Sequence, residues 1–81
     1  MRLDKYLKVS RLVKRRPVAN DACDAGRVAV NGKPARASYE VKIGDRIAIR
    51  FGEKLTTALV RDVRENVRAD DAGALYQIID E

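Results

Sequence analysis

The spacing of hydrophobic residues changes once along this chain, at Gly26. Before Gly26, apolar residues recur every three to four positions, which is typical of an amphipathic helix. After it, they alternate with polar residues, as they do in half-buried strands. Gly26 can adopt the left-handed conformation that ends a helix at low steric cost. The pattern therefore predicts a helical N-terminal part followed by a small sheet.

The first predicted helix covers residues 3–13. Its apolar sector holds Leu3, Tyr6, Leu7 and Val13, and its basic side holds Lys5, Lys8 and Arg11. Asp4 suits the first turn, where a carboxylate faces the positive end of the helix dipole. Leu12 falls on the basic side, so we expect the helix to kink or end near Ser10–Leu12.

The second predicted helix covers residues 17–25, with Pro17 at its first position, where the missing N–H costs nothing. A face of small residues would let it pack close to the first helix; this face comprises Val18, Ala19, Ala22, Cys23 and Ala25. No good N-cap residue precedes the helix, because Arg15 or Arg16 occupies that site. A locally poor choice of residue often marks a functional position.

Strands are predicted at residues 28–30, 46–51 and 55–63. Asn31-Gly32 is the dipeptide that best occupies the two positive-φ positions of a type I′ turn. In residues 46–51 the alternation points one set of side chains inward and the other outward. The inward set is Ile47, Ile49 and Phe51, and the outward set is Arg46 and Arg50.

The remaining segments are less regular. We expect residues 33–36 to be an irregular extended piece, residues 64–71 a charged linker, and residues 72–79 a short terminal element containing a helical turn. Residues 1–63 are thus predicted to form one α+β domain with the sheet, and residues 64–81 a short charged C-terminal extension. At 81 residues, with 46% hydrophobic and 36% charged, the chain is long enough for one small globular domain.

The composition excludes several classes of function. No apolar run approaches the roughly 20 residues of a membrane span, and charges interrupt any secretory signal, so we expect a cytoplasmic protein without a membrane partner. Histidine is absent, and no catalytic or phosphate-loop motif is present, which argues against an enzyme and predicts no cofactor and no metal site. The single cysteine, Cys23, is interpreted as a buried small hydrophobe.

Positive charge is concentrated in the N-terminal part. Residues 1–36 carry ten Lys and Arg against three Asp, a net charge of +7, whereas residues 37–81 carry seven against nine acids, a net charge of −2. Such a distribution favours a polyanionic partner. The candidate phosphate contacts are Arg2, Lys5, Lys8, Arg11, Lys14, Arg15 and Arg16, with Arg27 and Lys33 extending the same surface. Aromatic residues are scarce, so we do not expect stacking on bases. We expect contacts with the backbone of the nucleic acid and recognition of its shape.

Several motifs together resemble the S4-like RNA-binding domain family. They are Arg2-Leu-Asp-Lys-Tyr-Leu7, Ser10-Arg-Leu, Lys14-Arg-Arg, Gly26-Arg-Val-Ala-Val-Asn-Gly-Lys33 and Val41-Lys-Ile-Gly-Asp45. The resemblance covers roughly residues 1–51. It implies an S4-like (alpha-L) fold, with two N-terminal helices packed on a small, mainly antiparallel sheet and a basic helical face that binds structured RNA.

The resemblance also assigns roles to residues. It maps Arg2, Lys14, Arg15, Arg16, Arg27, Asn31 and Lys33 to the RNA face. Asp4 and Asp45 are expected to be structural. For Asn31, a role in the turn alone and a contact with RNA are equally favoured.

Over its full length the chain resembles small bacterial proteins of ribosome-associated quality control, and it is also similar to the fifteen-kilodalton heat-shock proteins. The resemblance implies binding to rRNA of large ribosomal subunits that retain peptidyl-tRNA, and holding of that tRNA while C-terminal tails are added to the stalled chain. Other quality-control factors are implied as partners, and a monomer is expected. The acidic end, Ile78-Ile-Asp-Glu81, favours the first group, because the heat-shock type has a long basic tail.

Two other functions remain open. Two short helices joined by a basic corner can mimic a DNA-binding helix-turn-helix, although Asp21 and Asp24 on the second helix oppose phosphate. A ribosome assembly factor or structural rRNA-binding component would carry the same basic surface.

Overall fold

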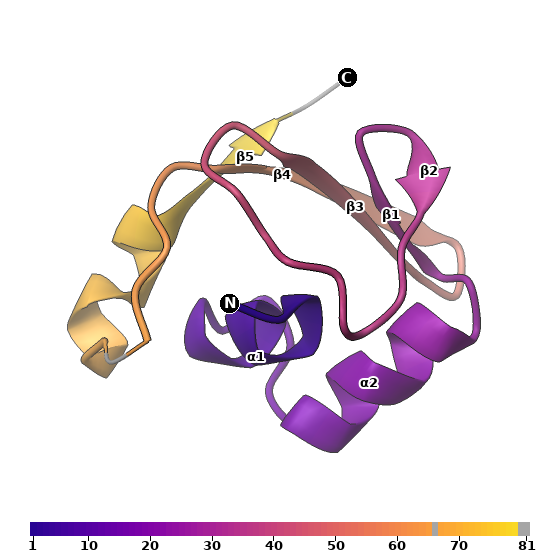
Figure 1. The fold of residues 1–81 in the computed structure, drawn as a ribbon, viewed down its shortest axis with the longest axis horizontal. Helices are drawn as coiled ribbons and strands as arrows, with labels where there is room; N and C mark the ends of the chain where they lie inside the picture. The colour runs from indigo at the N-terminus through magenta and orange to yellow at the C-terminus, as the bar shows by residue number, and fades with distance from the viewer. Residues whose placement is uncertain (66, 80–81) are drawn as a thin grey trace.

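Two short helices lie under one face of a curved, five-stranded sheet (Figure 1). The computed structural model describes residues 1–65 and 67–79. The elements are α1 (Leu3–Val9), α2 (Arg16–Asp24), β1 (Val28–Val30), β2 (Lys33–Pro34), β3 (Arg46–Phe51), β4 (Lys54–Val60), the 3-10 helix η1 (Ala69–Leu75) and β5 (Tyr76–Ile79). The sheet order is β2-β1-β3-β4-β5, and every neighbouring pair is antiparallel. This confirms the α+β prediction of two N-terminal helices on an antiparallel sheet. Within the described residues, no helix is long and apolar enough to cross a bilayer.

The first helix ends at Val9, so the prediction of helix through residue 13 was wrong beyond that point, whereas the expected end near Ser10–Leu12 is confirmed. Arg11 adopts a φ of 64°, a left-handed conformation that cannot continue a right-handed helix. The Ser10 hydroxyl donates a hydrogen bond to the Leu7 carbonyl. The backbone N–H of Val13 also reaches that carbonyl, at 3.0 Å. These bonds replace the helical ones that the turn removes.

The second helix begins one residue earlier than predicted, at Arg16, and ends at Asp24. Ala19, Ala22 and Cys23 are buried against the rest of the core, which confirms part of the small-residue face. Val18 and Ala25 were wrongly included in that face, because both are exposed. Burial is the main cause that raises the pKa of the Cys23 thiol to about 11, and the charges of Asp4 and Asp24 add to it. Cys23 therefore packs as a small hydrophobe.

The Asn31-Gly32 pair forms the predicted two-residue turn, with φ values of 53° and 84°. It pairs Val30 with Lys33, so residues 33–34 form the edge strand β2. The prediction of an irregular piece was wrong there, because a tight turn returns the chain directly alongside β1. Pro34 is tolerated because an edge strand need not donate its second row of hydrogen bonds.

In β3, Ile47 and Ile49 are buried as predicted. Phe51 was expected to point inward but is 40% exposed, because it lies at the far end of the β3–β4 hairpin beside the turn. β4 ends at Val60, not at residue 63 as predicted. There the chain leaves the ladder, and the N–H groups of Arg61 and Asp62 both donate to the Leu75 carbonyl.

The C-terminal residues complete the sheet. Tyr76–Ile79 form β5, which pairs with β4 along Thr57–Val60. The expected helical turn is η1, which lies earlier than predicted and ends at Leu75. The Leu75 side chain is fully buried, and its carbonyl accepts a 2.6 Å hydrogen bond from the Tyr6 hydroxyl of α1. Part of the segment expected to be an extension thus supplies a strand and a core residue.

Candidate nucleic-acid interface

The fold places most of the predicted cations around the two helices. Arg2 is the N-cap of α1, Lys5 and Lys8 lie on α1, Arg11 and Lys14 lie in the connection, Arg15 is the N-cap of α2 and Arg16 is its first residue. Six of these are exposed and Lys5 is half-buried. We refer to Arg2, Lys8, Arg11, Lys14, Arg15 and Arg16 as the α1–α2 basic surface.

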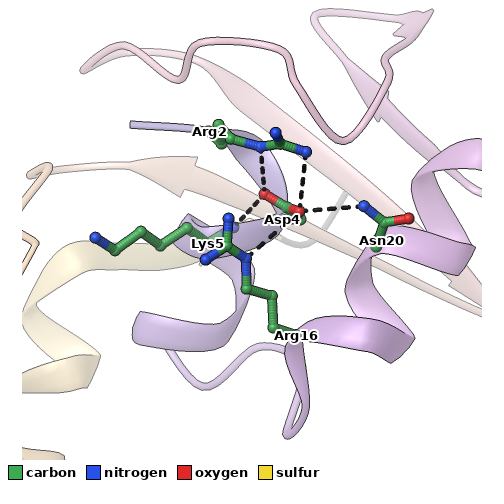
Figure 2. Close-up of polar contacts among 5 residues, drawn as sticks. All are labelled: Arg2, Asp4, Lys5, Arg16 and Asn20. Carbon is green, nitrogen blue, oxygen red and sulfur yellow. Dashed lines mark hydrogen bonds and ion pairs between the residues drawn. The ribbon is translucent and has the colours of Figure 1, made fainter.

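Asp4 connects the two helices within this surface (Figure 2). Arg2 donates from Nε to Asp4 Oδ1 at 3.2 Å and from Nη2 to Oδ2 at 3.3 Å. Arg16 approaches Oδ2 with its Nε at 3.5 Å, and Asn20 of α2 donates its amide N–H to Oδ2 at 3.2 Å. The backbone N–H of Lys5 donates to Oδ1 at 2.8 Å. One carboxylate thus holds an arginine from each helix.

The Asp4 side chain is only 3% exposed, whereas those of Arg2 and Arg16 are 51% and 48% exposed. Burial alone would raise the pKa of Asp4. The hydrogen bonds from Asn20, Arg2 and Lys5 and the charge of Arg16 outweigh burial, so the pKa lies below its ordinary value of 3.8. Asp4 is therefore ionised at neutral pH. This supports the structural role expected for it.

Asp45 organises the sheet end of the molecule in a similar way. It accepts hydrogen bonds from the Asn31 amide at 3.1 Å, the Tyr39 hydroxyl at 2.8 Å and the Lys42 N–H at 3.0 Å. Burial raises the pKa of Asp45, but these bonds and the Lys42 charge outweigh it and lower the pKa below 3.8. Asn31 also accepts the Arg46 N–H through its side-chain oxygen at 3.0 Å. Both ends of the Asn31 amide are thus engaged inside the protein, which favours its role in the turn.

We expect the protein to lose stability on acidification because of these two buried carboxylates. Their pKa values are lower in the folded chain than in the unfolded one, so their contribution is complete above about pH 4 and is lost as the pH falls through the folded values. Thermal melts between pH 6 and pH 2.5 measure this loss. Asp45→Asn should be less stable than the wild type at pH 6 and should show a shallower fall, whereas Glu53→Gln in the exposed β3–β4 turn should follow the wild-type curve. Parallel curves for wild type and Asp45→Asn would contradict this prediction.

Three of the predicted cations, Lys8, Arg11 and Lys14, line one shallow hollow at the end of α1. The left-handed conformation of Arg11 is uncommon for a residue with a side chain, and such outliers cluster at functional sites. The turn at Arg11 ends the helix, and the segment between α1 and α2 then places Lys14 beside α1. Three positive side chains around one open hollow can neutralise a phosphate group.

Sequence reasoning missed Arg68, which lines an adjoining hollow with Lys8 and Arg11. No motif in the sequence around Arg68 predicts this position, because Arg68 reaches α1 only when the C-terminal segment folds back beside the helix. The same segment places Glu65 3.8 Å from the Nζ of Lys5. Lys5 is also less exposed than the other six cations.

The remaining predicted residues lie in the β1–β2 hairpin or, in the case of Arg27, between α2 and β1. Arg27 precedes β1, and Lys33 lies in β2. Lys33 lines a hollow together with Asn31, Tyr39 and Arg36, a cation that the predicted set omitted. Its position three residues after Lys33 in the same basic half was the available signal. The predicted residues therefore form two groups, one on the helices and one at this hairpin.

Both groups consist mainly of positively charged side chains, which suit the binding of anions. Guanidinium groups favour bidentate contacts with phosphate. Tyr6, the aromatic residue of α1, is not available to stack on a base, because its side chain is fully buried and its hydroxyl donates a hydrogen bond to the Leu75 carbonyl. Among the side chains in residues 1–65 and 67–79, no three His, Cys, Asp or Glu are grouped as a metal site requires.

The profile of the S4 domain family matches residues 1–47 of this chain, which include α1, α2, β1, β2 and all ten predicted site residues. The chain belongs to the S4 domain family. The matched part of this S4 protein ends inside β3, so β4, η1 and β5 lie beyond it. The resemblance inferred from the motifs in residues 2–45 is thereby confirmed.

Full-length relatives extend the comparison. The S4 protein is 53% identical to the "RQC P-site tRNA stabilizing factor" of Halalkalibacterium halodurans, over 96% of this chain and 89% of that one. It is 47% identical to the factor of the same name from Bacillus subtilis, over 100% and 94%. Identity to "Heat shock protein 15" of Escherichia coli is 32%, over 95% of this chain and 59% of that protein. The resemblance to both groups is confirmed, and the first is the more similar.

Solved structures agree on the fold. The trimeric structure of Vibrio cholerae Heat Shock Protein 15 matches with a TM-score of 0.89 at 34% identity, over 98% of the S4 protein and 81% of that chain. The solution structure of the hypothetical protein HP1423 matches with a TM-score of 0.83 at 35% identity, over 100% and 99%. Both matches extend well beyond residue 47 and so take in most or all of the segment that forms η1 and β5.

Proposed function

We propose that this protein binds rRNA of the large ribosomal subunit together with a retained peptidyl-tRNA, and acts in quality control of stalled nascent chains. In this role it holds the tRNA while a C-terminal tail is added to the stalled chain. Relatives that match nearly the whole chain are named as factors that stabilise P-site tRNA in this process. The chain covers about nine-tenths of the length of each of those relatives.

The observation that carries the proposal is the arrangement of arginines from two helices on one buried carboxylate. Arg2 and Arg16 both contact Asp4, and Arg11 and Lys14 lie in the connection between the two helices. An array of positive side chains fixed in space fits the phosphates of a folded RNA better than those of a flexible strand. The second group, with Lys33 and Arg36, would contact a separate part of the RNA.

The proposed role is binding without a chemical step, so no catalytic residue is assigned. The partners are rRNA, tRNA and other ribosome quality-control factors in the cytoplasm. We propose that the protein acts as a monomer, since its basic surface needs no second copy to complete it.

A DNA-binding regulator is less well supported by the geometry. In a helix-turn-helix, α2 would enter the major groove and read base edges. Its exposed positions beyond Arg16 include Asp21 and Asp24, which repel phosphate, and it presents no Lys, Arg or Gln after the first turn. An assembly factor or structural rRNA-binding component shares the same surface and is separated from our proposal by which subunits it prefers.

Co-sedimentation tests the proposal. We expect the protein to pellet with large subunits that carry peptidyl-tRNA, and to do so more strongly than with vacant subunits. Binding to both should weaken steeply as salt increases, because each phosphate contact releases counterions. Equal binding to vacant subunits would favour a structural or assembly role, and preferential competition by duplex DNA over structured RNA at equal salt would favour the regulator.

A further inference from the structure

Asp4 has the wrong charge for a residue at the centre of a phosphate-binding surface. It nevertheless lies between Arg2 and Arg16, with its carboxylate buried and both guanidinium groups about half exposed (Figure 2). An acidic residue in contact with solvent would repel RNA. Asp4 instead presents its charge to the two arginines and hardly at all to the outside.

We propose that Asp4 is a positioning residue for RNA binding, which holds Arg2 and Arg16 in a fixed arrangement before RNA arrives. This inference rests on the proposed function, because it assigns a role to Asp4 within that binding surface. It concerns the arrangement of the arginines and not their number.

The contacts leave both arginines able to bind phosphate. A guanidinium group has five N–H donors, and Arg2 uses only two of its nitrogens, Nε and Nη2, on Asp4. Arg16 approaches Asp4 Oδ2 with its Nε at 3.5 Å. The two hydrogen bonds to Asp4 do not use Nη1 of Arg2. The exposed half of each side chain therefore retains donors for a phosphate oxygen.

The Asp4 carboxylate is itself held by groups from both helices. Asn20 of α2 and the backbone N–H of Lys5 in α1 each hold one Asp4 oxygen. These two groups fix a single carboxylate, and through it the side chains of two arginines. Long side chains that are ordered in the free protein lose less freedom on binding, so pre-organisation strengthens the complex.

The test is the effect of Asp4→Asn on binding, for which a pure charge effect and a positioning effect predict opposite results. Asp4→Asn raises the formal net charge from +5 to +6, which on electrostatics alone should tighten binding to any polyanion. If Asp4 positions the arginines, Asp4→Asn should bind large subunits carrying peptidyl-tRNA about fivefold or more weakly than wild type, the cost of ordering two side chains on binding. Its binding to single-stranded poly(U) should be equal or tighter, because a flexible strand adapts to mobile arginines.

Asp21→Asn is the matched control, because it makes the same charge change at an exposed position of α2. It should bind subunits and poly(U) at least as tightly as wild type. In an Arg2→Ala/Arg16→Ala background, Asp4→Asn should cause no further loss on subunits. Equal or tighter subunit binding by a folded Asp4→Asn would overturn the positioning role. Absence of subunit binding by wild type would instead contradict the proposed function.

A measurement on the wild-type protein keeps the inference testable if Asp4→Asn does not fold. In ¹⁵N relaxation of arginine side chains, the Nε–H groups of Arg2 and Arg16 should be ordered without RNA, whereas that of Arg15, the neighbouring N-cap, should be mobile. Equal mobility of all three would overturn the proposal, because nothing would then be held in place.

Discussion

Leu75→Ala should cost about 2–5 kcal/mol of the free energy of unfolding, the usual range for removing a buried leucine. Leu75 is fully buried in the core, where it joins the C-terminal segment to the two helices. Its backbone carbonyl accepts bonds from Tyr6, Arg61 and Asp62, and these remain in the variant. The loss therefore reports side-chain packing. For a domain of this size it corresponds to a fall in Tm of roughly 8 °C or more.

Leu55→Ala is the matched control, because Leu55 lies on β4 but is 57% exposed. Its effect should stay within about 0.5 kcal/mol. Urea unfolding of both variants gives the comparison. A small effect of Leu75→Ala, similar to that of Leu55→Ala, would mean that the C-terminal segment does not contribute to the core as described.

Arg16→Ala should weaken binding to large subunits by about tenfold or more, since hydrogen bonds to charged groups contribute about 1.5–3 kcal/mol each. Arg16 belongs to the α1–α2 basic surface, adjoins Arg15 and is pre-ordered by Asp4. Stability should fall by less than about 1 kcal/mol, because the ion pair is partly exposed and Arg2 still neutralises Asp4. Co-sedimentation and thermal melts measure the two effects separately.

Arg50→Ala removes the same side chain from the sheet face that points away from the helices and makes the same charge change. It should reduce subunit binding far less than Arg16→Ala, because an isolated exposed charge is largely screened. Equal losses from the two variants would show that overall charge, and not the helical surface, determines affinity. A large loss of stability in Arg16→Ala alone would make Arg16 a structural residue.

The predictable parts of this fold were those set by local chemistry. Gly26 separates helix from strand, and Asn31-Gly32 makes the tight turn, because few other residues tolerate positive φ. The alternation in residues 46–51 identified β3 with its bounds. The basic half of the chain was equally visible, since charge can be counted without a structure.

The parts that could not be predicted depend on contacts distant in sequence. Residues 76–79 become a strand because β4 offers a free edge, which no local pattern shows. Arg68 joins the hollow beside Lys8 for the same reason. The grouping of Arg2 and Arg16 depends on helix packing, because α2 must pack on α1 before both side chains reach Asp4. Helical periodicity also overestimated α1, since it does not register the left-handed turn at Arg11.

Cryo-imaging of the ribosomal particle that co-purifies with this protein would show where the two helices lie on it. We expect a large subunit that retains peptidyl-tRNA, with Arg2, Arg11 and Arg16 of the α1–α2 basic surface against the backbone of rRNA or tRNA. A particle without tRNA, or one in which the outer face of the sheet contacts RNA while the helices face solvent, would contradict this expectation.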